Sequence, residues 1–429
     1  MFDKIKSKIY KLLRSSERYT KTDMVYLTKG TFWLTLGQII ASASSFLLAI
    51  AFANLLPKET YGIYKYVLSI VGILNISTLS GINTAITQAV ARKFEGSVIP
   101  ALKMKIYWGA LGGTTGLILS GYYYSQGNTA LTISFLVVSA FMPFMDSFTI
   151  YDSLLSGKKL FRISTVYGVI SQVVAVVVLI IALFLTKNLF LILLAYFLPW
   201  TMLRFIFLKI TLKKFPPNQN KDPKTISYGK HLSFIGIIGT VASYLDRLLI
   251  FHYLGATEVA IYSIAIAPPD QIKNLFKNIP TLAMPKLAQR SFKEIGDILY
   301  MRLFYLFITG LAMAGIYSLF APYLFKMFFP KYLDSVFYSQ LFSVTLALKL
   351  PLSLISSVTQ SKITSIPKYL LYWTNTIPPA VLIVSLYLLT EPFEITGVII
   401  SRIALLIASL ATTCYVFKKL KTQKGLNII

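Results

Sequence analysis

The chain has 429 residues, of which 55% are hydrophobic and only 14% are charged, and its mean hydropathy is +0.67. Soluble domains carry about 25% charged residues, so this composition indicates a membrane protein. The net charge of +26 would suit nucleic acid, but Lys and Arg lie in short clusters between apolar runs rather than on one basic face, which excludes that partner. With one cysteine and two histidines, there is no disulfide framework and almost no room for a metal centre.

The first 29 residues form a basic segment without the apolar core and cleavage site of a secretory signal. Phe2, Ile5 and Ile9 recur at helical spacing with lysines between them. This pattern predicts an amphipathic helix on an anionic inner leaflet, with a basic tail that only fixes the topology as the alternative.

Twelve apolar segments follow, each about 20 to 25 residues long, which is the length that crosses a bilayer as a helix. Their approximate ranges are 30–54, 62–82, 104–124, 129–149, 163–186, 188–210, 232–254, 257–280, 299–320, 334–357, 367–390 and 395–417. Most Lys and Arg fall in every second loop. The positive-inside rule therefore predicts a multi-pass protein of the cytoplasmic (inner) membrane with both termini in the cytoplasm.

The longest connection lies at the midpoint of the chain and is rich in Pro, Asn and Lys, as expected of a solvated linker. The predicted divisions are a cytoplasmic basic N-terminus (1–29), an N-lobe (30–213), a cytoplasmic linker (214–229), a C-lobe (230–417) and a cytoplasmic basic tail (418–429). No soluble catalytic domain fits between the spans.

The two lobes share a motif. LPKETYGIY (residues 56–64) follows the first span of the N-lobe, and LGATEVAIY (residues 254–262) follows the first span of the C-lobe. With six spans in each half, both halves enter the membrane from the same side, which is typical of a parallel repeat. The sequence predicts an all-α polytopic membrane protein with two six-helix lobes related by a pseudo-two-fold axis.

Several segments carry a resemblance to a known family: the motifs at 56–64 and 244–265, together with GINTAITQAVARKFEG (81–96), YDSLLSGKKLFR (151–162) and LAMPKLAQ (282–289). In these the chain resembles the Wzx-like polysaccharide flippases of the multidrug/oligosaccharidyl-lipid/polysaccharide (MOP) exporter superfamily, which includes the MATE exporters. The resemblance implies two six-helix lobes around a central cavity. It also implies outward movement of a polyprenyl-pyrophosphate-linked oligosaccharide by alternating access.

Charged residues inside the spans are the first candidates for a site, because each costs about 2.5–3.5 kcal/mol at mid-helix unless it is paired or hydrated. They are Asp146, Asp246, Arg247, Asp270, Lys273, Lys349 and Arg402. Most lie in the second half, where cations suit an anionic diphosphate. The alternatives are ion pairs that lock helices together and lysines that snorkel to an interface.

Pro268 and Pro269 interrupt the eighth span, and Lys273 and Lys277 follow one turn apart, where we expect them to meet a pyrophosphate on entry. Polar neutral residues of the first half, Gln38 and Asn83 among them, face sugar hydroxyls or bond across helices. The predicted substrate-binding residues are Arg247, Lys273, Lys277, Lys349, Arg402, Asp246, Gln38 and Asn83, with Asp246 orienting Arg247.

No phosphate-loop, HExxH or GxSxG motif is present, so we expect no enzyme and no cofactor, with Na⁺ or H⁺ as the possible coupling ion. The expected partners are the lipid-linked oligosaccharide, membrane lipids and other membrane proteins of polysaccharide assembly. Three other functions stay open. A multidrug exporter would resemble relatives with acidic residues in the first lobe, a peptidoglycan-precursor flippase would resemble a fourteen-span plan, and a polymerase or ligase would have a large external loop.

Overall fold

The computed structural model describes residues 24–275, 292–361 and 367–425, and these contain helices and no strand. In chain order the elements are α2 (Met24–Leu55), α3 (Lys58–Leu74), η1 (Asn75–Thr78), α4 (Gly81–Ala91), η2 (Glu95–Ser97), α5 (Val98–Ser125), α6 (Thr129–Met145), η3 (Ser147–Thr149), α7 (Ile150–Gly157), α8 (Phe161–Leu185), α9 (Leu189–Lys214), α10 (Lys224–Ile235), α11 (Ile237–Tyr253), α12 (Ala256–Leu275), α14 (Phe292–Phe328), η4 (Pro330–Tyr332), α15 (Ser335–Ser343), α16 (Thr345–Ser361) and α17 (Lys368–Gly425).

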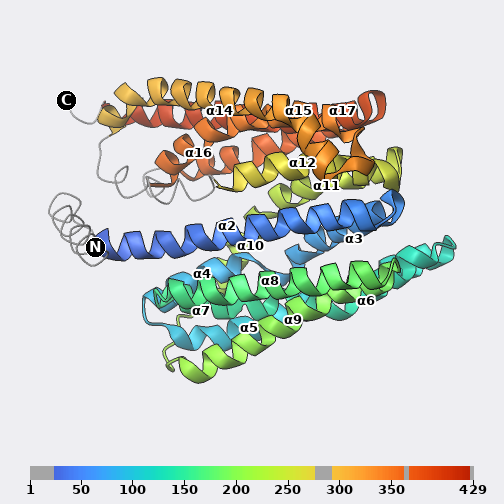
Figure 1. Ribbon diagram of the computed structural model, residues 1–429. Helices are drawn as coiled ribbons and strands as arrows, with labels where there is room; N and C mark the ends of the chain where they lie inside the picture. The colour runs from blue at the N-terminus through green and yellow to red at the C-terminus, as the bar shows by residue number, and fades with distance from the viewer. Residues whose placement is uncertain (1–23, 276–291, 362–366, 426–429) are drawn as a thin grey trace, which may run out of the picture.

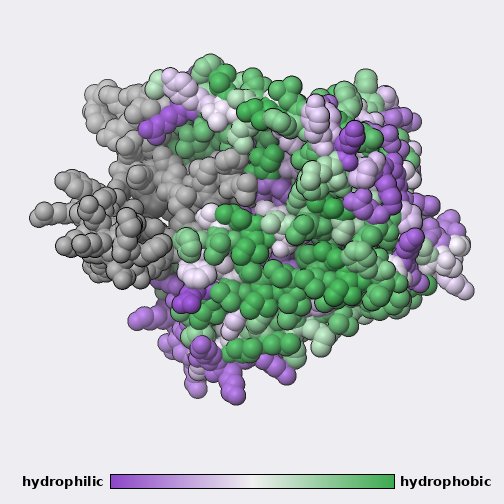
Figure 2. All heavy atoms as spheres, in the orientation of Figure 1, coloured by the Kyte–Doolittle hydropathy of each residue, from purple (hydrophilic) through white to green (hydrophobic). Residues whose placement is uncertain are grey.

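The helices form two lobes. In Figure 1 helices α4 to α9 make the lower set and α12 to α17 the upper set, with α2 and α3 between them. Within the N-lobe α2 packs on α8 and α5 on α6, and within the C-lobe α14 packs on α16 and α11 on α17. Apolar side chains cover the middle of the face in Figure 2 and hydrophilic ones gather toward its ends. The all-helical, two-lobed membrane fold predicted from the sequence is confirmed.

Among the described residues, seven helices are long and apolar enough to cross a membrane, or up to nine if each bent pair is one span. The element α17 covers the last two predicted spans. It consists of two helical stretches that meet at Glu394, whose dihedrals are non-helical (φ 49°, ψ −136°). The helices α5 and α12 cover two further predicted spans but are less apolar than these seven helices. The number twelve stays a prediction.

The repeated motifs follow two different helix stops. In the N-lobe α2 ends before Pro57, because a residue that precedes proline is disfavoured in helical geometry. In the C-lobe α11 ends before Gly255, whose φ of 95° is easily reached only without a side chain. Both stops turn the chain into a helix that packs against the other lobe, so that α3 lies on α11 and α12.

Among the described residues, the hydrophobic core that the two lobes share lies at one end of the molecule. We call the end where α2 begins the terminal end, and the end where α2 stops the far end (Figure 1). One hydrophobic core at the far end combines residues of both lobes, such as Phe52 and Tyr64 with Tyr262 and Phe325. At the terminal end the described residues form separate cores, one in the N-lobe and one in the C-lobe.

Polar contacts reinforce the far-end closure. Asn54 donates from Nδ2 to the Phe328 carbonyl at 2.9 Å, and Lys331 donates to the Asn54 carbonyl at 2.6 Å. Lys58 pairs with Asp334 at 3.0 Å. An exposed pair of this kind contributes at most about 1 kcal/mol, so packing of the shared core closes this end.

We expect Gly62→Ala to separate the lobes at the far end, because a Cβ atom at position 62 would lie 1.7 Å from the Ala256 carbonyl oxygen. The check is maleimide labelling of Val259→Cys, a fully buried position, in a Cys414→Ser background. Labelling should rise several-fold. The matched control is Gly121→Ala, since a Cβ there meets nothing within 4 Å; equal labelling in the two alanine variants would contradict the steric account.

The connection between the lobes is fixed to the N-lobe. The Gly96 N–H donates to the Asn220 carbonyl at 2.9 Å, and Arg92 pairs with Asp222 at 2.8 Å. The Lys224 backbone N–H, together with Arg92, holds the pKa of Asp222 below its usual value.

The helix α10, which begins the seventh predicted span, packs on α4 of the N-lobe, where the Gly81 N–H donates to Ser233 Oγ at 3.0 Å. A bend of 40° then leads into α11, which packs on α17. The chain therefore passes from one lobe to the other at this bend.

Candidate functional site

Two adjoining cavities lie beside α11 and α12. The first, which we call the inter-lobe cavity, has a volume of about 340 Å³ and takes its walls from both lobes. Its lining includes Ser45, Leu48, Ala49, Tyr61, Tyr64, Lys65, Gln172, Tyr196, Trp200, Arg247, Ser263, Asp270 and Gln271. Leu48 and Ala49 occupy the positions that the repeat aligns with Asp246 and Arg247, so this part of the N-lobe wall is apolar.

The second cavity, which we call the C-lobe cavity, has a volume of about 370 Å³. Its lining includes Ser243, Tyr244, Arg247, Tyr262, Asp270, Lys273, Phe342, Thr345, Lys349 and Arg402. The structure thus brings together four of the predicted cations, from α11, α12, α16 and α17. Arg247 and Asp270 line both cavities and mark where they adjoin.

Asp246 is the buried anchor of this cation cluster. Its carboxylate accepts from Arg402 Nη2 at 2.6 Å and Nε at 3.2 Å, and from the Tyr262 hydroxyl at 2.6 Å. Arg247 Nη1 lies 3.9 Å away. The sequence predicted that Asp246 orients Arg247, whereas its close partner is Arg402, which is 156 residues distant in the chain.

Arg247 keeps most of its hydrogen-bonding capacity unused. Its Nε is buried and has no hydrogen-bond partner among the described residues. Ser263 Oγ and Gln271 Oε1, which line the inter-lobe cavity, are also unpartnered there. Buried polar groups nearly always have partners, because an unmade hydrogen bond costs about 1–3 kcal/mol. Three such groups line one cavity, which makes this cavity a candidate site for a polar ligand.

Lys65 is a cation of this site that sequence reasoning missed. It projects from α3 into the inter-lobe cavity, with Nζ 5.3 Å from the Tyr61 ring centroid and no carboxylate within ion-pair distance in the described ranges. A signal was present, since Lys65 lies inside the predicted span 62–82. Charges within a span are expensive unless they serve a cavity.

The C-lobe lysines differ in their partners. Lys273 pairs with Asp270 one turn earlier on α12. Lys349 lines the C-lobe cavity and has no ion-pair partner among the described residues. Lys277 lies outside the described residues. Counting Lys65, Arg247, Lys273, Lys349 and Arg402 against Asp246 and Asp270, cations exceed carboxylates around the two cavities.

The two predicted N-lobe residues lie elsewhere. Gln38 donates to Ser42 Oγ at 3.4 Å on the same helix and lines neither cavity. Asn83 accepts from Lys105 Nζ at 2.8 Å inside the N-lobe. Lys105 also pairs with Asp146 at 2.9 Å, so the predicted intramembrane charge Asp146 has a buried partner that the sequence analysis did not single out. The N-lobe amide that lines the inter-lobe cavity is Gln172, which donates from Nε2 to Ser45 Oγ at 3.4 Å.

The described part of the chain contains no cluster of side chains that could hold a metal ion. No group of three or more His, Cys, Asp or Glu side chains gathers there. The two adjoining cavities are lined by positive charges, by aromatic rings and by hydrogen-bonding groups that have no partner among the described residues.

Comparison with known proteins places the chain. A family model described as "Polysaccharide biosynthesis protein" matches residues 27–289. The chain belongs to this family. It is also 24% identical over 279 residues to an uncharacterized membrane protein of Methanocaldococcus jannaschii, a match that covers 58% of this chain and 55% of the relative. The match therefore spans only about half the length of that relative.

Solved structures share the fold of this family member. The chain resembles the lipid II flippase MurJ in an inward closed conformation, with TM-score 0.66 and 15% identity over 92% of this chain and 87% of that one. It also resembles a MATE protein in complex with MaD5, with TM-score 0.63 and 13% identity over 95% and 98% of the two chains. The family predicted from the sequence is confirmed by this family match, the chain shares its fold with these MATE and MurJ structures, and the protein is a multi-pass membrane protein.

Proposed function

We propose that the protein moves a polyprenyl-diphosphate-linked oligosaccharide from one membrane leaflet to the other by alternating access. The observation that carries this proposal is Arg247, which lines two cavities with more cations than carboxylates and whose Nε has no hydrogen-bond partner among the described residues. A guanidinium binds phosphate oxygens through charge-assisted hydrogen bonds, and a diphosphate supplies enough negative charge for several such cations.

The inter-lobe cavity suits the sugar part of this substrate. Tyr61, Tyr64, Tyr196 and Trp200 give it an aromatic wall, and Gln172 and Ser263 add polar groups. Ligand pockets of about 300–1,000 Å³ typically combine apolar and aromatic lining with a few polar groups that fix the orientation. In this arrangement the diphosphate lies at Arg247 and the C-lobe cations, and the first sugars lie against the aromatic wall.

The charge of the site separates this proposal from the export of cationic drugs. MATE structures share the fold, but a cationic drug would meet Lys65 and Arg247 in the inter-lobe cavity, where cations outnumber carboxylates and would repel it. A peptidoglycan precursor shares the lipid diphosphate, as the likeness to the lipid II flippase suggests. The sugar part of the lipid is therefore the variable that the experiment changes.

The test is translocation in proteoliposomes. A fluorescent polyprenyl-diphosphate oligosaccharide should cross at least tenfold faster than in protein-free vesicles. Removing the charge in Lys349→Gln should lower the rate about tenfold, since a charge-assisted hydrogen bond contributes about 1.5–3 kcal/mol. The matched control is Lys326→Gln, an exposed lysine of α14 outside both cavities.

Two comparison substrates make the result decisive. A lipid II analogue that crosses faster than the oligosaccharide lipid would assign the protein to peptidoglycan precursors. Efflux of a cationic dye without movement of any diphosphate lipid would overturn the proposal. An imposed Na⁺ or H⁺ gradient in the same vesicles identifies the coupling ion.

A further inference from the structure

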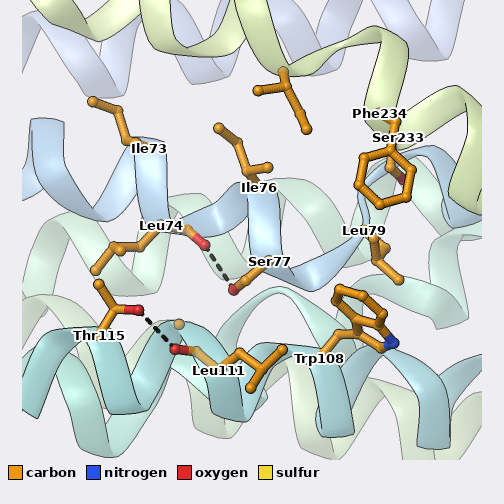
Figure 3. Close-up of a pocket in the computed structure, with 12 residues that line it drawn as sticks. Ile73, Leu74, Ile76, Ser77, Leu79, Trp108, Leu111, Thr115, Ser233 and Phe234 are labelled. Atoms are coloured by element: carbon orange, nitrogen blue, oxygen red, sulfur yellow. Dashed lines mark hydrogen bonds between the residues drawn. The ribbon is translucent and has the colours of Figure 1, made fainter.

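A third cavity, of about 270 Å³, lies away from the substrate site, where two broken helices face each other. Its walls come from the end of α3 and η1, from α5, and from both sides of the break between α10 and α11. Its lining is Ile73, Leu74, Ile76, Ser77, Leu79, Trp108, Leu111, Gly112, Thr115, Ser233, Phe234 and Ile237. We call it the bend pocket. Figure 3 shows Ile73, Leu74, Ile76 and Leu79, from the end of α3 and the η1 segment, above Trp108 and Leu111, with Phe234 closing one side.

The hydroxyl groups that line the bend pocket all donate to backbone carbonyls. Ser77 Oγ donates to the Leu74 carbonyl at 2.8 Å, and Thr115 Oγ1 donates to the Leu111 carbonyl at 2.9 Å, as the dashed lines in Figure 3 mark. Ser233 Oγ donates to the Gly229 carbonyl at 2.8 Å. An anionic or other acceptor ligand would find no free hydroxyl proton here and would lose its own hydration. An apolar chain fits without such a loss, in contrast to the inter-lobe cavity.

The pocket opens outward rather than toward the substrate site. Leu111 is 48% exposed and Phe234 54% exposed, so its mouth faces the surface that the membrane surrounds. Toward the C-lobe cavity it is closed by the contact of α3 with α11. There a Cβ atom at Gly72 would lie 2.2 Å from the Tyr244 ring, and Tyr244 itself lines the C-lobe cavity. The occupant therefore enters from the bilayer.

A lysine stands at the edge of the pocket. Lys230 Nζ lies 5.6 Å from the Trp108 ring centroid, and in the described ranges no carboxylate is within ion-pair distance of it. Nearby Tyr107 is 72% exposed and Tyr228 43% exposed. Exposed tyrosines beside a tryptophan and a lysine are typical of the depth at which lipid headgroups lie.

We propose that the bend pocket binds one acyl chain of an anionic membrane phospholipid, with the headgroup phosphate on Lys230. Such a chain would fill the space between the two breaks, which bend the helices by 45° at α3–α4 and by 40° at α10–α11. Because the polypeptide passes from the N-lobe to the C-lobe at the second break, a bound lipid would stabilise the bent form of the protein.

The experiment uses Trp108 as a reporter in the full-length protein. Phe replaces the other three tryptophans, Trp33, Trp200 and Trp373, and the protein is reconstituted in phosphatidylcholine with increasing amounts of a lipid brominated on its acyl chains, which quenches a tryptophan in contact. We expect brominated phosphatidylglycerol to reach half-quenching at about fivefold lower mole fraction than brominated phosphatidylcholine. Lys230→Gln should bring the ratio close to one.

Further variants keep the test decisive. The matched control is Lys209→Gln, whose ammonium lies 4.5 Å from the Phe205 ring but outside the pocket, and it should keep the fivefold ratio. Thr115→Phe, which fills the pocket from α5, should lower the maximal quenching by either lipid. Equal half-quenching by the two headgroups, or a preference that survives Lys230→Gln, would overturn the proposal. Displacement by undecaprenyl phosphate at lower mole fraction than by unbrominated phosphatidylglycerol would also overturn it and assign the pocket to the carrier lipid.

Discussion

Replacement of Lys105 by methionine should destabilise the N-lobe by about 3 kcal/mol, the lower end of the range for breaking a buried ion pair. The Lys105 side chain is fully buried, and its ammonium lies 2.9 Å from Asp146 Oδ2 and 2.8 Å from Asn83 Oδ1. Without it the Asp146 carboxylate keeps, among the described residues, the hydrogen bond from the Thr78 hydroxyl at 2.8 Å and the more distant charge of Arg204. Because the Asp146 side chain is still 26% exposed, water offsets part of the loss.

The free energy of unfolding of purified protein in mild detergent measures this effect. Lys103→Met is the matched control, since Lys103 lies on the same helix but is exposed, and it should change stability by less than about 0.5 kcal/mol. The double variant Lys105→Met/Asp146→Leu should regain most of the loss, because two apolar partners replace a buried pair with little penalty. A double variant as unstable as Lys105→Met would show that Lys105 acts through packing alone.

Arg247→Gln should weaken binding of the polyprenyl-diphosphate headgroup by about 100-fold, provided that the guanidinium makes two charge-assisted hydrogen bonds to phosphate. The structure supports so large an effect because Arg247 Nε has no partner among the described residues, and Asp246 lies 3.9 Å from its nearest terminal nitrogen. The guanidinium pairs only at long range with Asp246 and keeps its Nε donor unused, so we expect it to bind the ligand.

Affinity for a soluble short-chain prenyl diphosphate, measured by titration of protein in nanodiscs, checks this expectation. Arg247→Lys should recover only part of the affinity, because an ammonium keeps the charge but lacks the planar fork that matches phosphate. Arg302→Gln serves as the control, since Arg302 is exposed on α14 and lines neither cavity. Unchanged affinity in Arg247→Gln, with a normal unfolding profile, would remove Arg247 from the site.

The two expectations differ in what the residues do. Lys105 pairs with a carboxylate within its lobe, so we expect its loss to lower the free energy of unfolding. Arg247 lies where two cavities adjoin, so we expect its loss to lower the affinity for the ligand. Arg402 combines both roles, since it lines the C-lobe cavity while its guanidinium bonds to Asp246 and to the Ser243 carbonyl at 2.7 Å.

Much of the architecture follows from the sequence alone. Apolar runs of about 20 residues predict spanning helices, because in a bilayer each backbone N–H and C=O must be bonded within its own segment. That requirement is local, so hydropathy alone indicates the helices. The repeated motifs at residues 56–64 and 254–262 then indicate the two halves. The cost of intramembrane charge likewise marked Arg247, Lys273, Lys349 and Arg402 as residues of interest.

Only the tertiary structure decided which charges are paired and which are left for a ligand. Asp246 stands beside Arg247 in the chain but bonds to Arg402 on α17, and Asn83 bonds to Lys105 instead of facing a cavity. Lys65 joins the site because α3 packs on α11 and α12. Coulomb and hydrogen-bond energies depend on distances between side chains from separate helices, and those distances are set by packing. A single sequence records how much a buried charge costs, but not which neighbour offsets it.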